Sequence, residues 1–317
     1  MILKKYMVHK ISNFFLKLFQ SYLFIIVIAL VAALVYPQHV VVLSDYATFF
    51  LQVIFFLTCL KLNPKDFFSE LRNVKLIILA SLFMLLILPS VVYLFASWFV
   101  PSLAVGLLLL ASMPTGMTAP LLTEVVGGKP GTSLVLAVIT SILAPFTIPF
   151  IISVFVSTSV SVSSVAMFWS LVKVIVIPFV LGQLTRMYLQ KVIKPAKPFF
   201  KPTSLVLLGL LIAGVTAKQA DAILMQVGSS ILVDITVLTL FIAFLLFVGY
   251  FIAFWKTEKD RLTVAVSVTF MNFTLAIYLS GLYFNDPKVA LICVLVIFPW
   301  SLLLIPFEKI VHKFIPV

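Results

Sequence analysis

The residues best suited to binding a ligand lie between positions 114 and 149 of this 317-residue chain. Proline and glycine recur there beside hydroxyl side chains, as in Pro114-Thr115-Gly116-Met117-Thr118-Ala119-Pro120, and Glu124 follows four residues later. Both residue types interrupt helices, and in hydrocarbon each freed backbone group needs a partner in protein or in a watery cavity. A helix interrupted in this way, with hydroxyls beside the break, indicates the binding site of a transporter.

The composition indicates an all-α integral membrane protein. Hydrophobic residues make up 63% of the chain and charged residues 10%, whereas soluble domains carry about 25% charged residues. The apolar segments are too long for the alternating strands of a membrane barrel. We therefore expect ten transmembrane helices, each near the length needed to cross a bilayer. Their approximate ranges are 21–37, 47–62, 74–99, 102–127, 131–157, 164–187, 203–217, 230–255, 262–282 and 289–311.

The formal charge of +12 follows the expected topology and does not indicate a nucleic-acid partner. With a cytoplasmic N-terminus, nearly all lysines and arginines fall on the cytoplasmic side of ten spans, as the positive-inside rule requires. An odd number of spans would break this bias. We therefore expect a multi-pass protein of the cell (inner) membrane with both termini in the cytoplasm. Residues 1–20 have basic residues and apolar residues at helical spacing, which predicts an amphipathic helix on the lipid bilayer.

The expected spans divide into two sets of five around the serine-rich segment 157–164. An odd number of spans per set gives the two halves opposite orientations, which is the inverted repeat of many secondary transporters. We therefore divide the chain into the amphipathic segment 1–20, a first repeat at 21–157 and a second repeat at 158–317, together forming one transporter unit.

Two charged residues within expected spans are candidates for function. Glu124 lies four residues after Pro120, and an intramembrane carboxylate is a candidate for function, here as a proton carrier. The alternative is a position near the inner interface, where Glu124 would meet water or Lys129. Lys173 lies nearer the middle of its span and could attract an anionic substrate, pair with Glu124 or Asp234, or extend to the interface.

Covalent and nucleotide chemistry find no support in the sequence. The three histidines, His9, His39 and His312, fall at or beyond span ends, and the two cysteines, Cys59 and Cys293, lack metal-ligand spacing. The chain also has no glycine-rich loop for a nucleotide. We therefore expect neither an enzyme nor an ATP-driven pump, and no resident cofactor.

Three motifs can be taken together: Leu60-Lys61-Leu62-Asn63-Pro64-Lys65-Asp66-Phe67, the broken segment at 114–149, and Thr269-Phe270-Met271-Asn272-Phe273-Thr274-Leu275-Ala276. With them the chain resembles the bile acid:sodium symporter family, as a bacterial-type member, over nearly its whole length. The resemblance implies a core domain and a panel domain, with the fourth and ninth of ten helices unwound where they cross. It also implies a small organic anion as the substrate, either bile-acid-like or a carboxylate, and two sodium ions behind the crossover.

The chain departs from the family pattern at most positions of the sodium sites. Apolar residues or proline replace the usual amide and hydroxyl side chains at Met84, Ala119, Pro120, Ala137 and Met271, and Ser267 replaces a glutamate. Ser133 and Asn272 keep the family's residue types. Because a hard cation prefers several oxygen ligands, often with a carboxylate, these replacements leave two coupling ions to consider. The first is Na⁺ held by Ser133, Ser267, Thr269 and Asn272, and the second is H⁺ carried by Glu124.

We therefore predict a secondary active transporter that moves an organic anion by alternating access. The residues expected to bind the substrate are Thr115, Thr118, Asn272, Thr274 and Lys173. Sodium symport is the expectation that follows from the resemblance. The first alternative is a proton-coupled or uncoupled carrier or exporter that uses Glu124, and the second is a membrane sensor that does not transport.

Overall fold

The computed structural model describes residues 22–61, 73–156, 163–226 and 231–314, so the expected amphipathic segment 1–20 lies outside it. Within the described ranges the chain is helical, and its one extended feature is an isolated antiparallel bridge between Thr115 and Met271. The α-helices are α2 (Tyr22–Val35), α3 (Pro37–Val40), α4 (Ala47–Cys59), α6 (Val74–Leu82), α7 (Leu88–Phe99), α8 (Ala104–Ala111), α9 (Ala119–Val125), α10 (Pro130–Val156), α11 (Ser164–Leu171), α12 (Ile177–Tyr188), α13 (Gln190–Ala217), α14 (Ala220–Gln226), α15 (Ile231–Phe251), α16 (Glu258–Thr269), α17 (Phe273–Tyr283), α18 (Pro287–Leu295) and α19 (Ile297–Phe314).

Six helical stretches are long and apolar enough to cross a membrane, and the protein is a multi-pass membrane protein. These stretches are Pro37–Cys59, Val74–Phe99, Pro130–Val156, Ser164–Tyr188, Gln190–Ala217 and Ile231–Phe251. Shorter apolar helices, Phe24–Val35, Pro101–Ala111, Phe273–Tyr283 and Pro287–Trp300, occupy the other four expected spans. Most residues of α8, α17 and α18 are buried among other helices.

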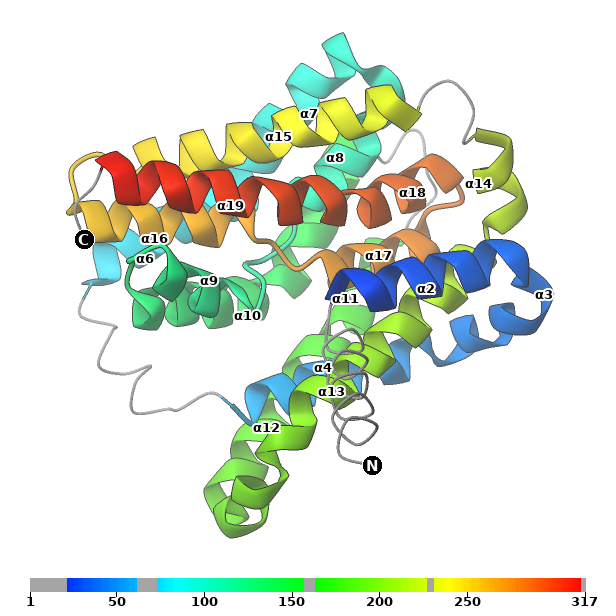
Figure 1. Cartoon of the computed structure of the whole chain (residues 1–317), viewed down its shortest axis with the longest axis horizontal. Coiled ribbons are helices and arrows are strands. Elements are labelled where there is room, and N and C mark those ends of the chain that lie inside the picture. Colours follow the sequence, from blue (N-terminus) through cyan, green and yellow to red (C-terminus); the bar gives the residue numbers. More distant parts are fainter. Residues whose placement is uncertain (1–21, 62–72, 157–162, 227–230, 315–317) are drawn as a thin grey trace, which may run out of the picture.

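The expected seventh span at 203–217 is too short, and this prediction was wrong. Helix α13 begins at Gln190, 13 residues earlier, and runs for 28 residues through three internal prolines. The basic segment between α12 and position 203 is therefore helical. Figure 1 shows α12 and the first turns of α13 as an arm that projects from the rest of the molecule.

Proline interrupts some spans and not others. Helix α10 continues through Pro145 and Pro149. Pro89 and Pro178 each follow a short π-helical turn, at Phe83–Ile87 and Val172–Val176. The wider turn leaves space for a ring that would otherwise clash with the carbonyl four residues earlier. These spans therefore stay continuous, and the break that positions the site lies elsewhere.

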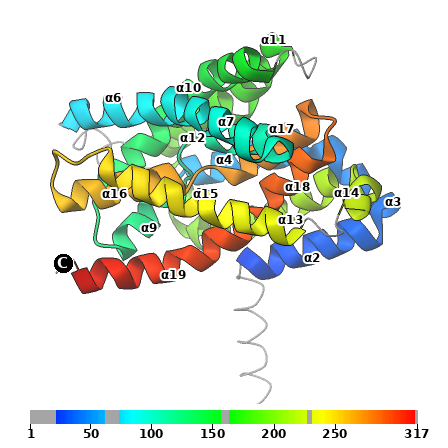
Figure 2. The same cartoon turned by 90° about the horizontal axis from the view of Figure 1, so that it is seen from above.

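The helices pack as two groups. In one group α13 packs against α2, α4 and α12, and in the other α15 packs against α16 and α19 while α10 packs against α9 and α16. Figures 1 and 2 show the two groups side by side. Helix α17 contacts α4 and α13 of the first group and α8 and α18 of the second. The start of α17 is therefore the place where both groups can contribute to one site.

A candidate substrate site at two paired helix breaks

The first break separates α8 from α9 and is specified by its own residues. Helix α8 ends at Ala111 and α9 begins at Ala119. Pro114 has no backbone N–H and disfavours helical geometry at the residue before it. Gly116 follows two residues later, so the chain has little tendency to continue as a helix through these positions.

The second break separates α16 from α17 and pairs with the first. Helix α16 ends at Thr269 and α17 begins at Phe273. The Gly116 N–H donates to the Phe270 carbonyl at 2.7 Å, and the Asn272 N–H donates to the Pro114 carbonyl at 2.8 Å. Each unwound segment therefore satisfies backbone groups of the other, as a buried break in a membrane protein requires.

Glycine at position 116 permits this close pairing. A Cβ atom there would lie 2.8 Å from the Phe270 carbonyl oxygen and 3.0 Å from that of Met271. Both oxygens belong to the backbone and cannot rotate away as a side chain could. The two breaks can therefore approach this closely only when residue 116 lacks a side chain.

Thr115 connects the two breaks and is not among the residues that line the cavity described below. Its side chain is fully buried, and its hydroxyl donates to the Ser267 carbonyl at 2.9 Å. Its backbone N–H donates to the Thr140 hydroxyl at 3.1 Å. The residue was expected to bind substrate, and the structure places it instead in the packing between α10 and α16.

Two of the residues expected to hold a sodium ion, Ser133 and Ser267, meet where α10 packs against α16. The Ser267 hydroxyl donates to the Ser133 hydroxyl at 2.9 Å, and both side chains are fully buried. Thr269 is fully buried too, and its hydroxyl has no hydrogen-bond partner among the described residues. The Asn272 side chain accepts a hydrogen bond from the Leu275 N–H at 3.1 Å and thereby caps the start of α17.

A cavity of about 310 Å³ lies between the paired breaks and the helices α4 and α13. Three of the residues expected to bind substrate, Thr118, Asn272 and Thr274, line it together with Gly116. The opposite wall comes from one face of α4, at Leu51, Ile54, Phe55 and Thr58, and one face of α13, at Lys201, Ser204, Leu205 and Leu208. The cavity therefore combines polar groups at the breaks with a facing wall of mixed apolar and polar side chains.

Two lysines, Lys61 and Lys201, also line this cavity, and neither was among the residues expected to bind substrate. Lys61 lies two residues beyond the span Pro37–Cys59. Although its side chain reaches solvent, desolvation by the surrounding protein lowers its pKa, and the charge of Lys201 lowers the pKa further. Lys61 follows Thr58 by three residues, and this spacing was the signal that could have identified it, because a helix continued to Lys61 would place both on one face.

Lys173 and Glu124 do not reach the cavity. Lys173 is exposed on the π-helical turn Val172–Val176, and its carbonyl accepts a hydrogen bond from the Gln52 side chain at 3.1 Å. Glu124 is exposed on α9. The pairings considered for them do not form, because Asp234 pairs with Lys288 at 2.6 Å and Lys129 pairs with Asp260 at 2.7 Å. Among the described residues, no group of three His, Cys, Asp or Glu residues could hold a metal ion.

Comparison with known proteins gives distant relatives that are transporters by name. The chain is 24% identical to an uncharacterized sodium-dependent transporter of Bacillus subtilis over 68% of this chain and 67% of the relative. It is 23% identical to a probable chloroplastic sodium/metabolite cotransporter of Arabidopsis thaliana, over 61% and 48% of the two chains. It is 27% identical to sodium/bile acid cotransporter 7 of Danio rerio, over 56% and 54%. The match therefore spans about half the length of the plant and fish relatives.

The family assignment covers the first break and most of the cavity wall. The model of the sodium bile acid symporter family matches residues 48–226, which is more than half of the 317 residues. This region includes nearly all of α4, the first break and α13, which supply one complete wall of the cavity and part of the other. The chain belongs to the sodium bile acid symporter family, a family of transporters.

Proposed function

We propose that this protein is a secondary transporter that carries a small organic anion through the cavity beside the paired breaks. The observation that carries the proposal is that two lysines and the start of α17 face the same cavity. A helix N-terminus has free amide groups and a positive partial charge, so it favours a carboxylate. Asn272, Thr118 and Thr274 add neutral polar groups, while the apolar face of α4 and α13 suits the body of an organic anion.

The proposed movement is alternating access. The group containing α2, α4, α12 and α13 would be the panel domain, and the group containing both breaks would be the core domain. The first repeat at 21–157 and the second at 158–317 each contain one break, which supports an inverted pair of five-helix units. Movement of the core against the panel would open the cavity to each side of the membrane in turn. The positive-inside bias supports an inner-membrane location with both termini in the cytoplasm.

The coupling ion is the point on which the relatives and the local geometry differ. Relatives named as sodium-dependent make sodium symport the first candidate. The second candidate is a carrier that does not need sodium, and the Ser267–Ser133 hydrogen bond favours it. A sodium ion between these residues would have to replace that bond, and the described neighbours include hydroxyls and carbonyls but no carboxylate to balance its charge. A proton carried by Glu124 stays a prediction, since Glu124 is exposed on α9 and does not line the cavity.

The test is uptake by the purified full chain in liposomes, with radiolabelled taurocholate and pyruvate as probes. We expect uptake of at least one probe, and a loss of that uptake in the double variant Lys61→Gln/Lys201→Gln. Lys197→Gln is the matched control, because Lys197 lies exposed on the same helix and does not line the cavity. Equal uptake in the double variant and the control would contradict the assignment of the cavity. Binding of both probes without uptake would indicate a sensor.

The same liposomes separate the two coupling candidates. A sodium gradient and a matched potassium gradient are imposed at equal ionic strength and equal membrane potential. Faster uptake with sodium supports symport, and this stimulation should then disappear in Ser133→Ala. Equal uptake under both gradients supports the sodium-independent carrier.

A further inference from the structure

Two tyrosines of α17 contact neighbouring helices through their hydroxyls. The Tyr278 hydroxyl lies 3.1 Å from the Thr48 hydroxyl of α4, which is a hydrogen-bond distance. The Tyr283 hydroxyl donates to the Ala166 carbonyl of α11 at 2.9 Å, so its oxygen accepts from the Ser170 hydroxyl, 2.6 Å away. Helix α4 belongs to the first helix group, and α11 forms one continuous span with α12 of that group. The hydroxyls therefore connect the helix that follows the second break with two spans of the first group.

These hydrogen bonds lie beyond one end of the substrate cavity. On α4 the lining begins at Leu51, three residues after Thr48, and on α17 it ends at Thr274, four residues before Tyr278. Tyr278 is only 2% exposed, and its side chain does not line the cavity. The other end is lined by Lys61, which is exposed, so the cavity reaches the protein surface there. The cavity is thus open toward the lysines and closed where the tyrosines bind.

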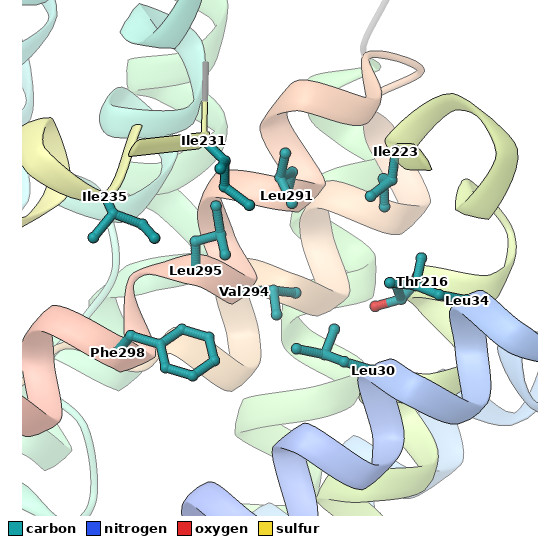
Figure 3. Close-up of a pocket in the computed structure, with 10 residues that line it drawn as sticks. All are labelled: Leu30, Leu34, Thr216, Ile223, Ile231, Ile235, Leu291, Val294, Leu295 and Phe298. Atoms are coloured by element: carbon teal, nitrogen blue, oxygen red, sulfur yellow. The ribbon is translucent and has the colours of Figure 1, made fainter. Parts of the chain in front are cut away.

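Packing between the two helix groups is incomplete near the closed end. A second cavity, of about 340 Å³, has walls from α2, α13 and α14 on one side and from α15, α18 and α19 on the other, as Figure 3 shows. Its lining is apolar apart from Thr216. Thr216 directly follows Val215, whose side chain would lie 2.5 Å from a Cβ placed at Gly281 of α17. Because protein interiors contain few spaces of this size, the direct contacts of α17 contribute more to holding the groups together here.

We propose that Tyr278 and Tyr283 form a latch that closes the substrate cavity at the end opposite Lys61. The latch rests on the proposed transport function, because a carrier must open that end to admit or release its substrate. Opening would separate α17 from α4 and α11, and both tyrosine hydroxyls would lose their partners. Neutral hydrogen bonds between side chains in a membrane are individually weak, so the latch favours the closed state without preventing its release.

The test measures from which face of the membrane a reagent can reach the cavity. Thr274→Cys is introduced into the full chain, in which Cys59 and Cys293, both buried, are replaced by alanine. A membrane-impermeant maleimide is added to intact cells or to inverted vesicles, and the rate of labelling is measured for each face. Lys61→Cys in the same background identifies the face at the lysine end. Thr274→Cys should be labelled faster from that face than from the opposite one.

Removing the hydroxyls should change this preference. Tyr278→Phe keeps the aromatic ring, and we expect labelling from the face opposite the lysines to become about two- to tenfold faster, the factor that corresponds to one neutral hydrogen bond. Tyr278→Phe/Tyr283→Phe should label faster still, and Thr48→Val should match Tyr278→Phe because it removes the same bond from α4. Tyr250→Phe is the matched control, since the Tyr250 hydroxyl donates to Glu258 at 2.9 Å, within the second group. The control should label as the parent does.

The latch is wrong if the tyrosine variants and Thr48→Val elute as folded proteins and still label from the opposite face as slowly as the parent. If Tyr278→Phe does not fold, Thr48→Val decides the question, and Met117→Cys replaces Thr274→Cys if that reporter does not fold, because Met117 also lines the cavity. Labelling needs no transported substrate. Normal uptake with unchanged labelling therefore counts against the latch alone, and faster labelling without uptake of either probe counts against the transport function alone.

Discussion

The two helix breaks meet at one place but arise from different causes. The first break contains Pro114 and Gly116, which prevent a continuous helix wherever they occur. The second break, at residues 270–272, has no proline or glycine between positions 262 and 280. It unwinds at the point where its backbone pairs with the first break. The comparison teaches that one locally specified break can impose a second break on a partner that has no strong local signal.

The difference also explains which residues face the substrate cavity. At the first break, the Thr115 hydroxyl donates to the Ser267 carbonyl of α16. Of the two threonines at this break, only Thr118 lines the cavity. At the second break, Asn272 and Thr274 both line it. The first break therefore mainly supplies the structural pairing, and the second supplies more of the polar surface. The predictions below test this division.

The largest effect is expected from Gly116→Ala, which disrupts the backbone pairing between the two breaks. The new Cβ would lie 2.8 Å from the backbone oxygen of Phe270, so the breaks must separate, at a cost of about 1–3 kcal/mol. We expect a lower unfolding temperature in detergent and loss of transport. Gly106→Ala is the control, because the atoms nearest to a Cβ there belong to the Ile292 side chain, at 3.0 Å, and not to the backbone. If the Gly116→Ala protein were as stable and active as the control, this would contradict the inference that the first break imposes the second.

A smaller loss is expected from Thr115→Val, which removes the hydroxyl link between the breaks. The Ser267 carbonyl loses its 2.9 Å partner, and an unsatisfied buried acceptor of this kind costs about 1–2 kcal/mol. Thermal unfolding of the purified protein measures the loss, and Thr115→Ser should restore most of the stability. If the valine variant lost substrate binding with no change in stability, Thr115 would contact the substrate directly.

Asn272 allows the capping role and the cavity role of the second break to be separated. Asn272→Ala removes the cap of α17 and should lower stability by about 1 kcal/mol and weaken probe binding. Asn272→Asp keeps an acceptor for the Leu275 N–H, so stability should be preserved, but its negative charge faces the cavity and should repel an anion. Thermal unfolding and taurocholate binding are measured on both variants. Strong anion binding by the aspartate variant would mean that residue 272 does not face the substrate.

The smallest effect is expected on the wall opposite the breaks, where Lys61 should make binding depend on pH. Its lowered pKa means that its charge, and with it taurocholate binding, declines as the pH rises through that value. In Lys201→Gln, binding should be about two- to tenfold weaker, because one charged partner is missing. The decline should begin at a higher pH, because the repulsion by Lys201 no longer acts on Lys61. Binding curves between neutral and alkaline pH measure both effects, and an identical midpoint in the two proteins would contradict the proximity of the lysines.

The same shift predicts the sign of the pH effect on stability. Because folding lowers the pKa of Lys61 below 10.5, protonating this group disfavours the folded state at every pH below the lowered value. That penalty disappears as the pH rises from the lowered value toward 10.5. Lys201→Gln removes the repulsion between the two lysines. Near neutral pH this should relieve part of the penalty and offset stability that is lost with the Lys201 side chain.

Sequence alone determined that this is a membrane protein, which segments are apolar, and where the first break lies. These properties depend on composition and on the local geometry of proline and glycine, so no knowledge of distant contacts was needed. The beginning of α13 was misjudged, because its three prolines resemble a loop in sequence and are nevertheless accommodated within a helix. The second break was expected only from the family resemblance, since its own residues have no helix-breaking signal.

Tertiary structure decided which of the polar residues come together. Ser133 and Ser267 are 134 positions apart and share a hydrogen bond, whereas Glu124 and Lys173, both charged and within expected spans, face away from the cavity. Lys61 and Lys201 became a pair only because α4 and α13 pack against each other. The direction of a side chain depends on the rotation of its helix against its neighbours, and that rotation is set by packing between distant segments.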